Sequence, residues 1–409
     1  MSVNSFDDLL NFIEIDQHSN NKKQNICFVN YTPEGVIIEE NLTVDYEISY
    51  DFLLYLINNK FYKLIFTSCI FNFDLNINEE FAYKISNKND VPDEFVRNEC
   101  FGNLNFEFRS CTFKKRVNFD NFDYNGKLKF RHCFFNIIKI NNATFNDLFE
   151  ISFSEIQSIA VFNKVDFNAN CVFTKTKFFK NCVFIYCTFE KQGVFSRAKF
   201  MDSNDKPTAL DLSQCIVNGQ LTFFETQIEN YTAIRIDSKD EKKFDELTKS
   251  GEHIPIQNKR ETFRIIKNQL IEQNNLIDAE KYAKLEKQVF LEEKNLDAIF
   301  EASMLKTLKI LLSDYFVLKL NKYSNNFKTS WSVALLFVLT IGLLSHSLLS
   351  ISENYHFYEY TNIIKLFNLT DFSLVEKDAS SKFYVMHFFT KIAIGYGIYQ
   401  FIQAFRKFR

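Results

Sequence analysis

Apolar residues between Phe101 and Asn230 recur in pairs, with one variable residue between the two members of each pair. The first member is small or medium-sized and the second is large. Within runs the large members fall five positions apart, and between runs the step often becomes six. The pairs are Cys111/Phe113, Val117/Phe119, Leu128/Phe130, Cys133/Phe135, Ile138/Ile140, Ala143/Phe145, Ile151/Phe153, Ala160/Phe162, Val165/Phe167, Cys171/Phe173, Thr176/Phe178, Cys182/Phe184, Cys187/Phe189, Gly193/Phe195, Ala198/Phe200, Leu210/Leu212, Cys215/Val217 and Leu221/Phe223.

A period of five fits neither an α-helix, whose apolar face repeats about every 3.6 residues, nor an amphipathic strand, which alternates every second residue. It fits a chain that turns a corner once per unit and points two side chains inward on each short face. Stacked coils of this kind would pair as parallel strands. The large members would then fill the axis, and the predicted core is Phe113, Phe130, Phe135, Phe145, Phe162, Phe167, Phe173, Phe178, Phe184, Phe189 and Phe200.

This pattern resembles that of the pentapeptide-repeat family, over about residues 60–230. The resemblance implies a β-solenoid, namely a right-handed quadrilateral β-helix with four units per coil. The chain departs from the family in using phenylalanine where leucine is usual at the large position. Insertions near 74–100 and at Met201–Ala209 would form loops. The alternative is an ordinary phenylalanine-rich β-domain.

The nine cysteines follow the same repeat, since seven of them stand at the small position. Cysteine there would act as a compact buried apolar residue. The competing interpretation is a redox or metal cluster, but the cysteines keep the spacing of the repeat and form no CxxC pair. We therefore predict no metal site and no cofactor.

The remaining chain divides by composition. Residues 1–60 are predicted to form an α+β cap with short helices at 6–14 and 52–59, and 61–235 form the β-helix. Residues 236–259 are a charged linker. Helical periodicity then predicts a hairpin at 260–328, with helices at 260–273 and 276–312. These helices would pack on the end of the β-helix or, alternatively, bind a partner or a second copy.

Two apolar stretches in residues 329–409 predict a transmembrane hairpin. The first, 331–351, has no charged residue, and the second, 383–405, is interrupted by Lys391. Lysines and arginines flank both outer ends, whereas residues 352–382 hold five acidic residues against three lysines. The positive-inside rule then places both termini in the cytoplasm, at a bacterial inner membrane. The alternative is a pair of buried helices in a soluble domain.

Candidate chemistry is sparse. With only nine glycines the chain has no phosphate-binding glycine motif, and it has no GxSxG. His132 is expected at a corner of a coil. His346, His387 and Lys391 form a polar cluster in the predicted spans, for hydrogen bonding between helices or for ion or proton passage. The sequence IAIGYG, ending at Gly397, looks like a potassium-channel filter, but we predict that it is helical.

These features predict a non-enzymatic scaffold that is anchored in membrane lipid and presents a β-helix to an unknown protein partner or to copies of itself. Its candidate surface includes Lys114, Lys115, Arg131, Lys175 and Lys177. Nucleic acid is not expected, because residues 101–230 carry 16 basic and 13 acidic side chains, too balanced for DNA mimicry or for DNA binding. The alternative function is an oligomeric membrane pore, by analogy in stress or phage defence.

Overall fold

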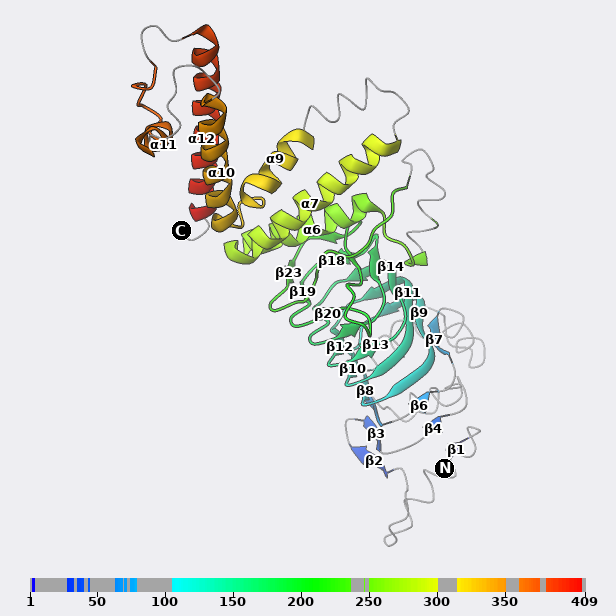
Figure 1. Ribbon diagram of the computed structural model, residues 1–409. Helices are drawn as coiled ribbons and strands as arrows, with labels where there is room; N and C mark the ends of the chain where they lie inside the picture. The colour runs from blue at the N-terminus through cyan, green and yellow to red at the C-terminus, as the bar shows by residue number, and fades with distance from the viewer. Residues whose placement is uncertain are drawn as a thin grey trace. The chain divides into compact units, whose positions relative to one another are not determined.

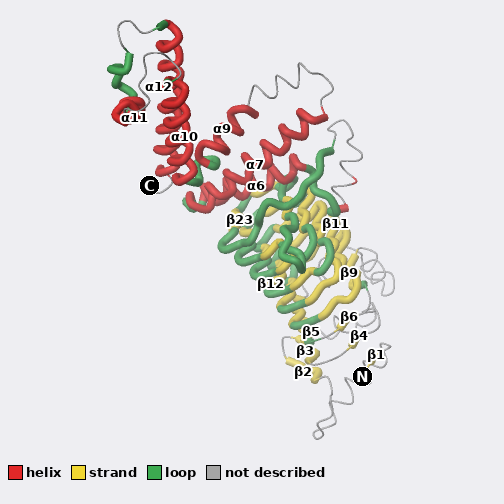
Figure 2. Tube along the Cα trace, in the orientation of Figure 1, coloured by secondary structure: helices red, strands yellow, loops and turns green. Residues whose placement is uncertain are grey.

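The structure is a computed structural model. It describes residues 2–3, 28–32, 35–39, 43–44, 63–68, 70–71, 74–78, 105–236, 246, 250–300, 315–350, 360–375 and 380–406. The chain divides into two compact units, Met1–Asn274 and Asn275–Arg409. The first is a β-solenoid that ends in one helix, and the second is helical (Figures 1 and 2).

One sheet of the solenoid runs in the order β2-β3-β5-β8-β10-β12-β15-β19-β23. All of its pairings are parallel except that of β2 with β3, which is an antiparallel hairpin. The strands are β2 (Phe28–Thr32), β3 (Gly35–Glu39), β5 (Lys63–Thr67), β8 (Asn105–Arg109), β10 (Leu128–Arg131), β12 (Phe149–Ser152), β15 (Cys171–Val172), β19 (Gln192–Val194) and β23 (Gln220–Thr222).

A second sheet winds around the other sides of each coil, along the path β1-β4-β6-β9-β11-β13-β16-β20, and it carries the further strands β7, β14, β17, β18, β21 and β22. Its pairings are all parallel. The strands are β1 (Ser2–Val3), β4 (Thr43–Val44), β6 (Ile70–Phe71), β7 (Leu75–Asn78), β9 (Thr112–Tyr124), β11 (Phe134–Phe145), β13 (Glu155–Ile156), β14 (Ala160–Phe167), β16 (Lys177–Phe178), β17 (Cys182–Ile185), β18 (Thr188–Phe189), β20 (Lys199–Phe200), β21 (Leu210–Asp211) and β22 (Ile216–Val217).

The register shows how long one coil is. Phe149 pairs with Cys171, and Cys171 pairs with Gly193, so that one coil takes 22 residues. The next step, from Gly193 to Leu221, is longer because the insertion at 201–209 forms a small loop, closed by an antiparallel bridge between Met201 and Pro207. The predicted β-solenoid is therefore confirmed.

The core is a set of aromatic columns parallel to the solenoid axis. Phe66, Phe108 and Phe130 stack on successive coils, with ring centroids 5.2 Å and 4.8 Å apart. Phe113 of the neighbouring column meets Phe130 edge to face at 5.7 Å. Stacking within a column and edge contacts between columns are the favoured ring geometries, each worth about 0.5–1.5 kcal/mol beyond burial. All the phenylalanines predicted for the core are at most 2% exposed.

One predicted pair is wrong. Ile151 is buried, but Phe153 is 45% exposed, because the inward pair on this face is Phe149 and Ile151. Phe149 fills the position that Cys171 and Gly193 hold in the next two coils, and its ring lies 6.0 Å from that of Phe173. The size order is thus reversed in this coil, and Phe153 falls beyond the corner.

Helix α6 (Ile256–Glu272) closes the C-terminal end of the solenoid. It begins four residues before the predicted Arg260, since its buried face extends back to Ile256. Thr262 Oγ1 accepts from the backbone N–H of Leu212 at 3.0 Å, and Gln269 Oε1 accepts from that of Leu221 at 2.7 Å. These side chains satisfy backbone N–H groups of the last coil, one just after β21 and one in β23, that would otherwise be left at an open end. The first helix of the predicted hairpin therefore packs on this end of the solenoid.

The second unit contains α7 (Leu276–Phe300), α9 (Phe316–Asn325), α10 (Trp331–Leu349), α11 (Tyr360–Phe367) and α12 (Ser381–Phe405). Helices α10 and α12 pack side by side, and α11, from the loop between them, packs on both (Figure 1). Of the described residues, only α10 forms a helix long and apolar enough to cross a membrane. α12 covers the second predicted span, but its composition does not reach the same level.

Two other predictions lie partly or wholly outside the described residues. The short helices expected at 6–14 and 52–59 lie outside the described residues, and β1–β4 extend the solenoid sheets into this part of the sequence. Half of the linker expected at 236–259 also lies outside, at 237–245 and 247–249, as do residues 301–314.

Candidate interaction surface

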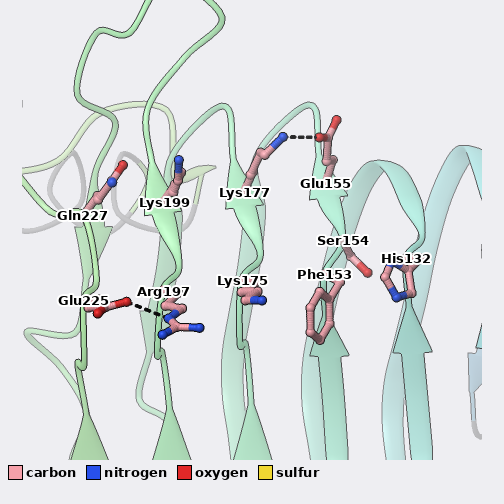
Figure 3. A pocket seen from close by; sticks show the side chains of 10 residues that line it. All are labelled: His132, Phe153, Ser154, Glu155, Lys175, Lys177, Arg197, Lys199, Glu225 and Gln227. Carbon is pink, nitrogen blue, oxygen red and sulfur yellow. Dashed lines mark hydrogen bonds and ion pairs between the residues drawn. The ribbon is translucent and has the colours of Figure 1, made fainter.

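One corner of the solenoid is built from residues with left-handed backbone conformation. On successive coils they are His132 (φ 56°), Phe153 (53°), Lys175 (55°), Arg197 (59°) and Glu225 (51°). Residues other than glycine are uncommon there, because Cβ crowds the following carbonyl. The corner nevertheless keeps a side chain on every coil, and these side chains form a row along the axis (Figure 3).

A second row runs beside the first, two residues further along each coil. It contains Glu155, Lys177, Lys199 and Gln227 (Figure 3). Together the two rows line a surface groove of about 620 Å³, which also includes Ser154. The groove therefore draws its residues from five successive coils.

The middle of the groove holds four cations, which we call the basic square: Lys175, Lys177, Arg197 and Lys199. Lys177 and Lys199 are direct partners in the pairing of β16 with β20. Like charges in such positions repel each other. At the two ends, Lys177 Nζ lies 2.6 Å from Glu155 Oε1, and Arg197 Nε lies 2.6 Å from Glu225 Oε2.

The remaining two cations of the square have no carboxylate partner among the described residues. Lys175 Nζ instead lies 4.7 Å from the centroid of the Phe153 ring. His132 stacks on Phe153, with ring centroids 5.0 Å apart. The Phe153 ring therefore lies between His132 of the preceding coil and Lys175 of the following coil, as Figure 3 shows.

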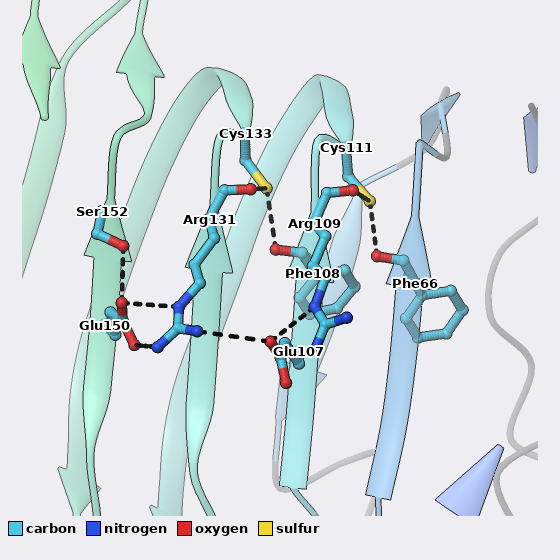
Figure 4. Close-up of polar contacts among 9 residues, drawn as sticks. All are labelled: Phe66, Glu107, Phe108, Arg109, Cys111, Arg131, Cys133, Glu150 and Ser152. Atoms are coloured by element: carbon cyan, nitrogen blue, oxygen red, sulfur yellow. Dashed lines mark hydrogen bonds and ion pairs between the residues drawn. The ribbon is translucent and has the colours of Figure 1, made fainter. Parts of the chain in front are cut away.

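A separate ionic cluster joins three coils of the first sheet (Figure 4). Arg131 donates from Nε and Nη2 to the two carboxylate oxygens of Glu150, at 2.9 Å and 2.8 Å. Arg109 Nε donates to Glu107 Oε1 at 2.8 Å, and Ser152 Oγ donates to Glu150 Oε1 at 2.7 Å. Each carboxylate is thus occupied by an arginine.

The Arg131 pairing is strong enough to change how Glu150 titrates. Burial alone would raise the pKa of Glu150, but the hydrogen bonds from Arg131 and Ser152, with the charges of Arg131 and Lys129, lower it on balance. Arg131, which the sequence placed on the candidate surface, therefore clamps coils together.

The cysteines of the solenoid that the structure describes form no disulfide bonds. Four of them donate a weak S–H bond to a carbonyl one coil earlier, for example Cys133 Sγ to Phe108 O at 3.3 Å (Figure 4). Burial raises the pKa of Cys187 to about 12. Such thiols are unreactive packing groups. Among the described residues no group of three or more His, Cys, Asp or Glu side chains could hold a metal ion.

The helical unit buries a small apolar cluster of Leu349, Leu366, Phe383 and Ile394, and it also leaves many large apolar side chains exposed. The contact side of α10 buries Ala334, Gly342, Ser345 and His346. The contact side of α12 is similar, with the buried residues Phe383, His387, Thr390, Lys391, Ile394, Gly397, Gln400 and Ala404. Large apolar side chains point outward, and those at least 45% exposed include Leu336, Leu339, Leu343, Leu344, Leu348, Val385, Phe388, Phe389, Ile392 and Ile402.

Two of the three residues in the predicted polar cluster come together. Lys391 Nζ donates to the carbonyls of Lys365, Leu366 and Asn368, at 2.8, 3.3 and 2.7 Å. These carbonyls belong to the C-terminal end of α11, where a cation is favourable. His387 lies beside the same segment, with its ring 6.0 Å from that of Phe372. His346, the third residue, is buried on α10.

The glycines near the end of α12 are helical, as predicted. Residues 392–397 lie inside α12, which is continuous. A Cβ on Gly397 would lie 3.0 Å from Val338 Cγ2 of α10, whereas one on Gly395 would be 3.6 Å from Leu369. Gly397 therefore permits the close contact between α10 and α12.

Sequence reasoning found half of the basic square, Lys175 and Lys177, and missed Arg197 and Lys199. A signal was present, because the pattern Lys-x-Lys at 175–177 recurs as Arg-x-Lys at 197–199, one 22-residue coil later. Phe153 was missed because it was assigned to the core. Lys114 and Lys115 lie on β9 and do not line the groove.

Comparisons of this chain with protein-family models, with curated proteins and with solved structures find no match.

Proposed function

We propose that this protein is a membrane-anchored, non-enzymatic scaffold. A β-helix of the pentapeptide type, right-handed and four-sided, would display ordered rows of side chains to a protein partner. The α10–α12 hairpin would anchor it in a bacterial inner membrane with both termini in the cytoplasm. The observation that carries the proposal is the contrast between the two surfaces: polar rows outside the solenoid, and large apolar side chains outside the helix pair.

The apolar surface supports the membrane part. In water, leucines such as Leu336 (66% exposed) and Leu344 (59%) would form a costly apolar patch on one helix. In lipid the same residues are matched by hydrocarbon, and small or polar residues belong between the helices. Although α12 contains Lys391, its ammonium is bound by carbonyls of α11, which lowers the cost of placing it in a membrane.

The solenoid surface supports the scaffold part. Its interior is filled by phenylalanines whose stacked ring centroids lie, for example, 4.8 and 4.9 Å apart, so that the outward side chains are attached to a closely packed core. Successive coils place these side chains about 4.8 Å apart. A stiff row of this kind recognises a partner without large rearrangement of its backbone.

Membrane extraction tests the anchor. The full chain expressed in bacteria is expected to remain with membranes after an alkaline carbonate wash and to be released by detergent. Leu339→Arg with Leu343→Arg should lose much of this retention, because arginine near the centre of a span costs about 2.5–3.5 kcal/mol. The matched control, Tyr186→Arg with Phe224→Arg on exposed apolar positions of the solenoid, should be retained. Release of the unaltered chain by carbonate would disprove the anchor.

A membrane-potential dye separates the scaffold from the pore. Expression of the full chain should leave the potential unchanged, because Lys391 is engaged in a helix end rather than lining a passage. Depolarisation that disappears in Lys391→Ala or His387→Ala would favour the pore instead.

A further inference from the structure

We propose that the groove over the basic square binds an extended acidic peptide of a partner protein, one in which an aromatic or large apolar residue precedes two or three acidic residues. The inference rests on the proposed scaffold function, because it names the kind of partner that the solenoid would recognise. It is carried by the juxtaposition of unpaired cations with an exposed aromatic edge in one groove.

Charge is the first step. The groove is lined by four lysine or arginine side chains and two glutamates. Glu155 and Glu225 pair with one cation each, on opposite corners of the square, so that Lys175 and Lys199 remain for an incoming anion. Their exposure keeps them hydrated but also available, and the repulsion between Lys177 and Lys199 is relieved when a carboxylate lies between them.

Length is the second step. From His132 to Glu225 the groove crosses four coil-to-coil steps, or about 19 Å at about 4.8 Å per step. An extended peptide rises about 3.3 Å per residue, so about six residues span the groove. The distance from the Phe153 coil to the Arg197 coil is two steps, which corresponds to about three peptide residues.

The aromatic end selects a peptide over a nucleic acid. A base would have to stack on a free ring face. The Phe153 ring has His132 stacked at 5.0 Å and the Lys175 ammonium at 4.7 Å, so its faces are occupied while 45% of the residue remains exposed. An exposed ring edge suits an apolar side chain that packs beside it.

Fluorescence anisotropy with the detergent-solubilised full chain tests the proposal. The probe is a fluorescein-labelled peptide of sequence Gly-Phe-Gly-Asp-Glu-Asp-Gly. Lys175→Glu with Lys199→Glu should weaken binding at least about tenfold, and the corresponding glutamine variant by about threefold, as expected for lost and reversed surface charge pairs. Added salt should weaken binding to the unaltered chain.

The matched control is Lys114→Glu with Lys164→Glu, which makes the same change of net charge at exposed positions outside the groove. Lys164 also occupies a left-handed corner (φ 53°), as Lys175 does. This variant should bind as the unaltered chain does. Equal loss in both variants would mean that only net charge matters and would overturn the site.

Peptide controls complete the test. Replacement of the acidic residues by Asn and Gln should abolish binding, and replacement of the phenylalanine by alanine should weaken it several-fold. No binding of the acidic probe, or equal and equally groove-dependent binding of a ten-nucleotide oligothymidylate, would overturn the proposal. Because membrane retention is measured separately, failure here leaves the anchor standing, whereas loss of retention leaves peptide binding intact.

Discussion

The solenoid and the helical unit differ in where they place large apolar side chains. In the solenoid, large aromatic side chains such as Phe162 are inside, and lysines such as Lys175 are outside. In the α10–α12 pair, Gly342 and Lys391 are inside, and leucines such as Leu336 are outside. The first arrangement is stable in water through apolar burial, and the second is stable where the surroundings are apolar. Under the proposed function, the solenoid would face water and the outward leucines of the helical unit would face lipid.

The largest expected effect tests whether removal of a phenylalanine ring destabilises the solenoid but not the helical unit. Phe162→Ala should destabilise the solenoid by about 3–5 kcal/mol, because Phe162 is fully buried and stacks on Phe184 at 4.6 Å. Phe388→Ala, on the outward face of α12, should change neither unit in detergent. The single tryptophan, Trp331, lies in α10, so its fluorescence follows the helical unit while the far-ultraviolet strand signal follows the solenoid.

A control within the solenoid sharpens this result. Phe153→Ala should cost less than about 1 kcal/mol, since the ring is largely outside the core. If Phe153→Ala lowered the free energy of unfolding as much as Phe162→Ala, Phe153 would belong to the core. The inward pair would then be Ile151 and Phe153, as the sequence predicted.

The next effect tests whether small residues are required inside the helical unit. Gly342→Ala should cost about 1–3 kcal/mol, because the new methyl group would overlap the Phe367 ring of α11. Gly395→Ala is the matched control, since its methyl group would be at 3.6 Å from Leu369 and alanine favours the helix by up to about 1 kcal/mol. Trp331 fluorescence during titration with a denaturing detergent measures both. Equal behaviour of the two variants would argue against close packing at Gly342.

The sequence could predict those features that depend on the size and charge of side chains, but not those that depend on backbone conformation or backbone carbonyls. The coil was predictable, because large apolar residues such as Phe130 and Phe135 recur five positions apart, each with a smaller residue two positions before it. The face of Phe153 was not, because Phe149 and Phe153 fit the same pattern and only the left-handed corner distinguishes them. The partners of Lys391 were also beyond reach, since they are backbone carbonyls, which any residue supplies. The basic square was visible in principle, as an Arg/Lys-x-Lys pattern that repeats after one coil.

A buried carboxylate in the solenoid provides a pH test of the comparison. Asp211 is 1% exposed and accepts from Asn258 Nδ2 at 3.0 Å and from the Ser213 backbone N–H at 2.9 Å. Burial raises its pKa, and these bonds only partly offset that effect. As the pH rises above the unfolded pKa, the unfolded chain loses this proton first, so the solenoid should lose stability until the folded pKa is passed.

Comparison with Asp211→Asn isolates the contribution of Asp211 ionisation to the pH dependence of stability. The variant cannot ionise, so its thermal midpoint should fall less between pH 4 and pH 7 than that of the unaltered chain, whatever its absolute stability. Parallel pH profiles, followed by the far-ultraviolet strand signal, would show that Asp211 is not desolvated and that the α6 end is more open to water than the structure indicates.

The smallest effect concerns the left-handed corner on the outside of the solenoid. Residues with a side chain are less stable than glycine in this backbone conformation. Lys175→Gly should stabilise the solenoid by about 0.5–1 kcal/mol, because glycine adopts φ 55° without the Cβ crowding. Lys177→Gly, two residues on in a strand and also exposed, should destabilise it by a similar amount and lose the ion pair to Glu155. Chemical unfolding measures both changes. A more stable Lys175→Gly that binds the acidic peptide less well would show that the corner retains lysine for recognition, whereas a less stable one would mean that the contact with Phe153 outweighs the backbone cost.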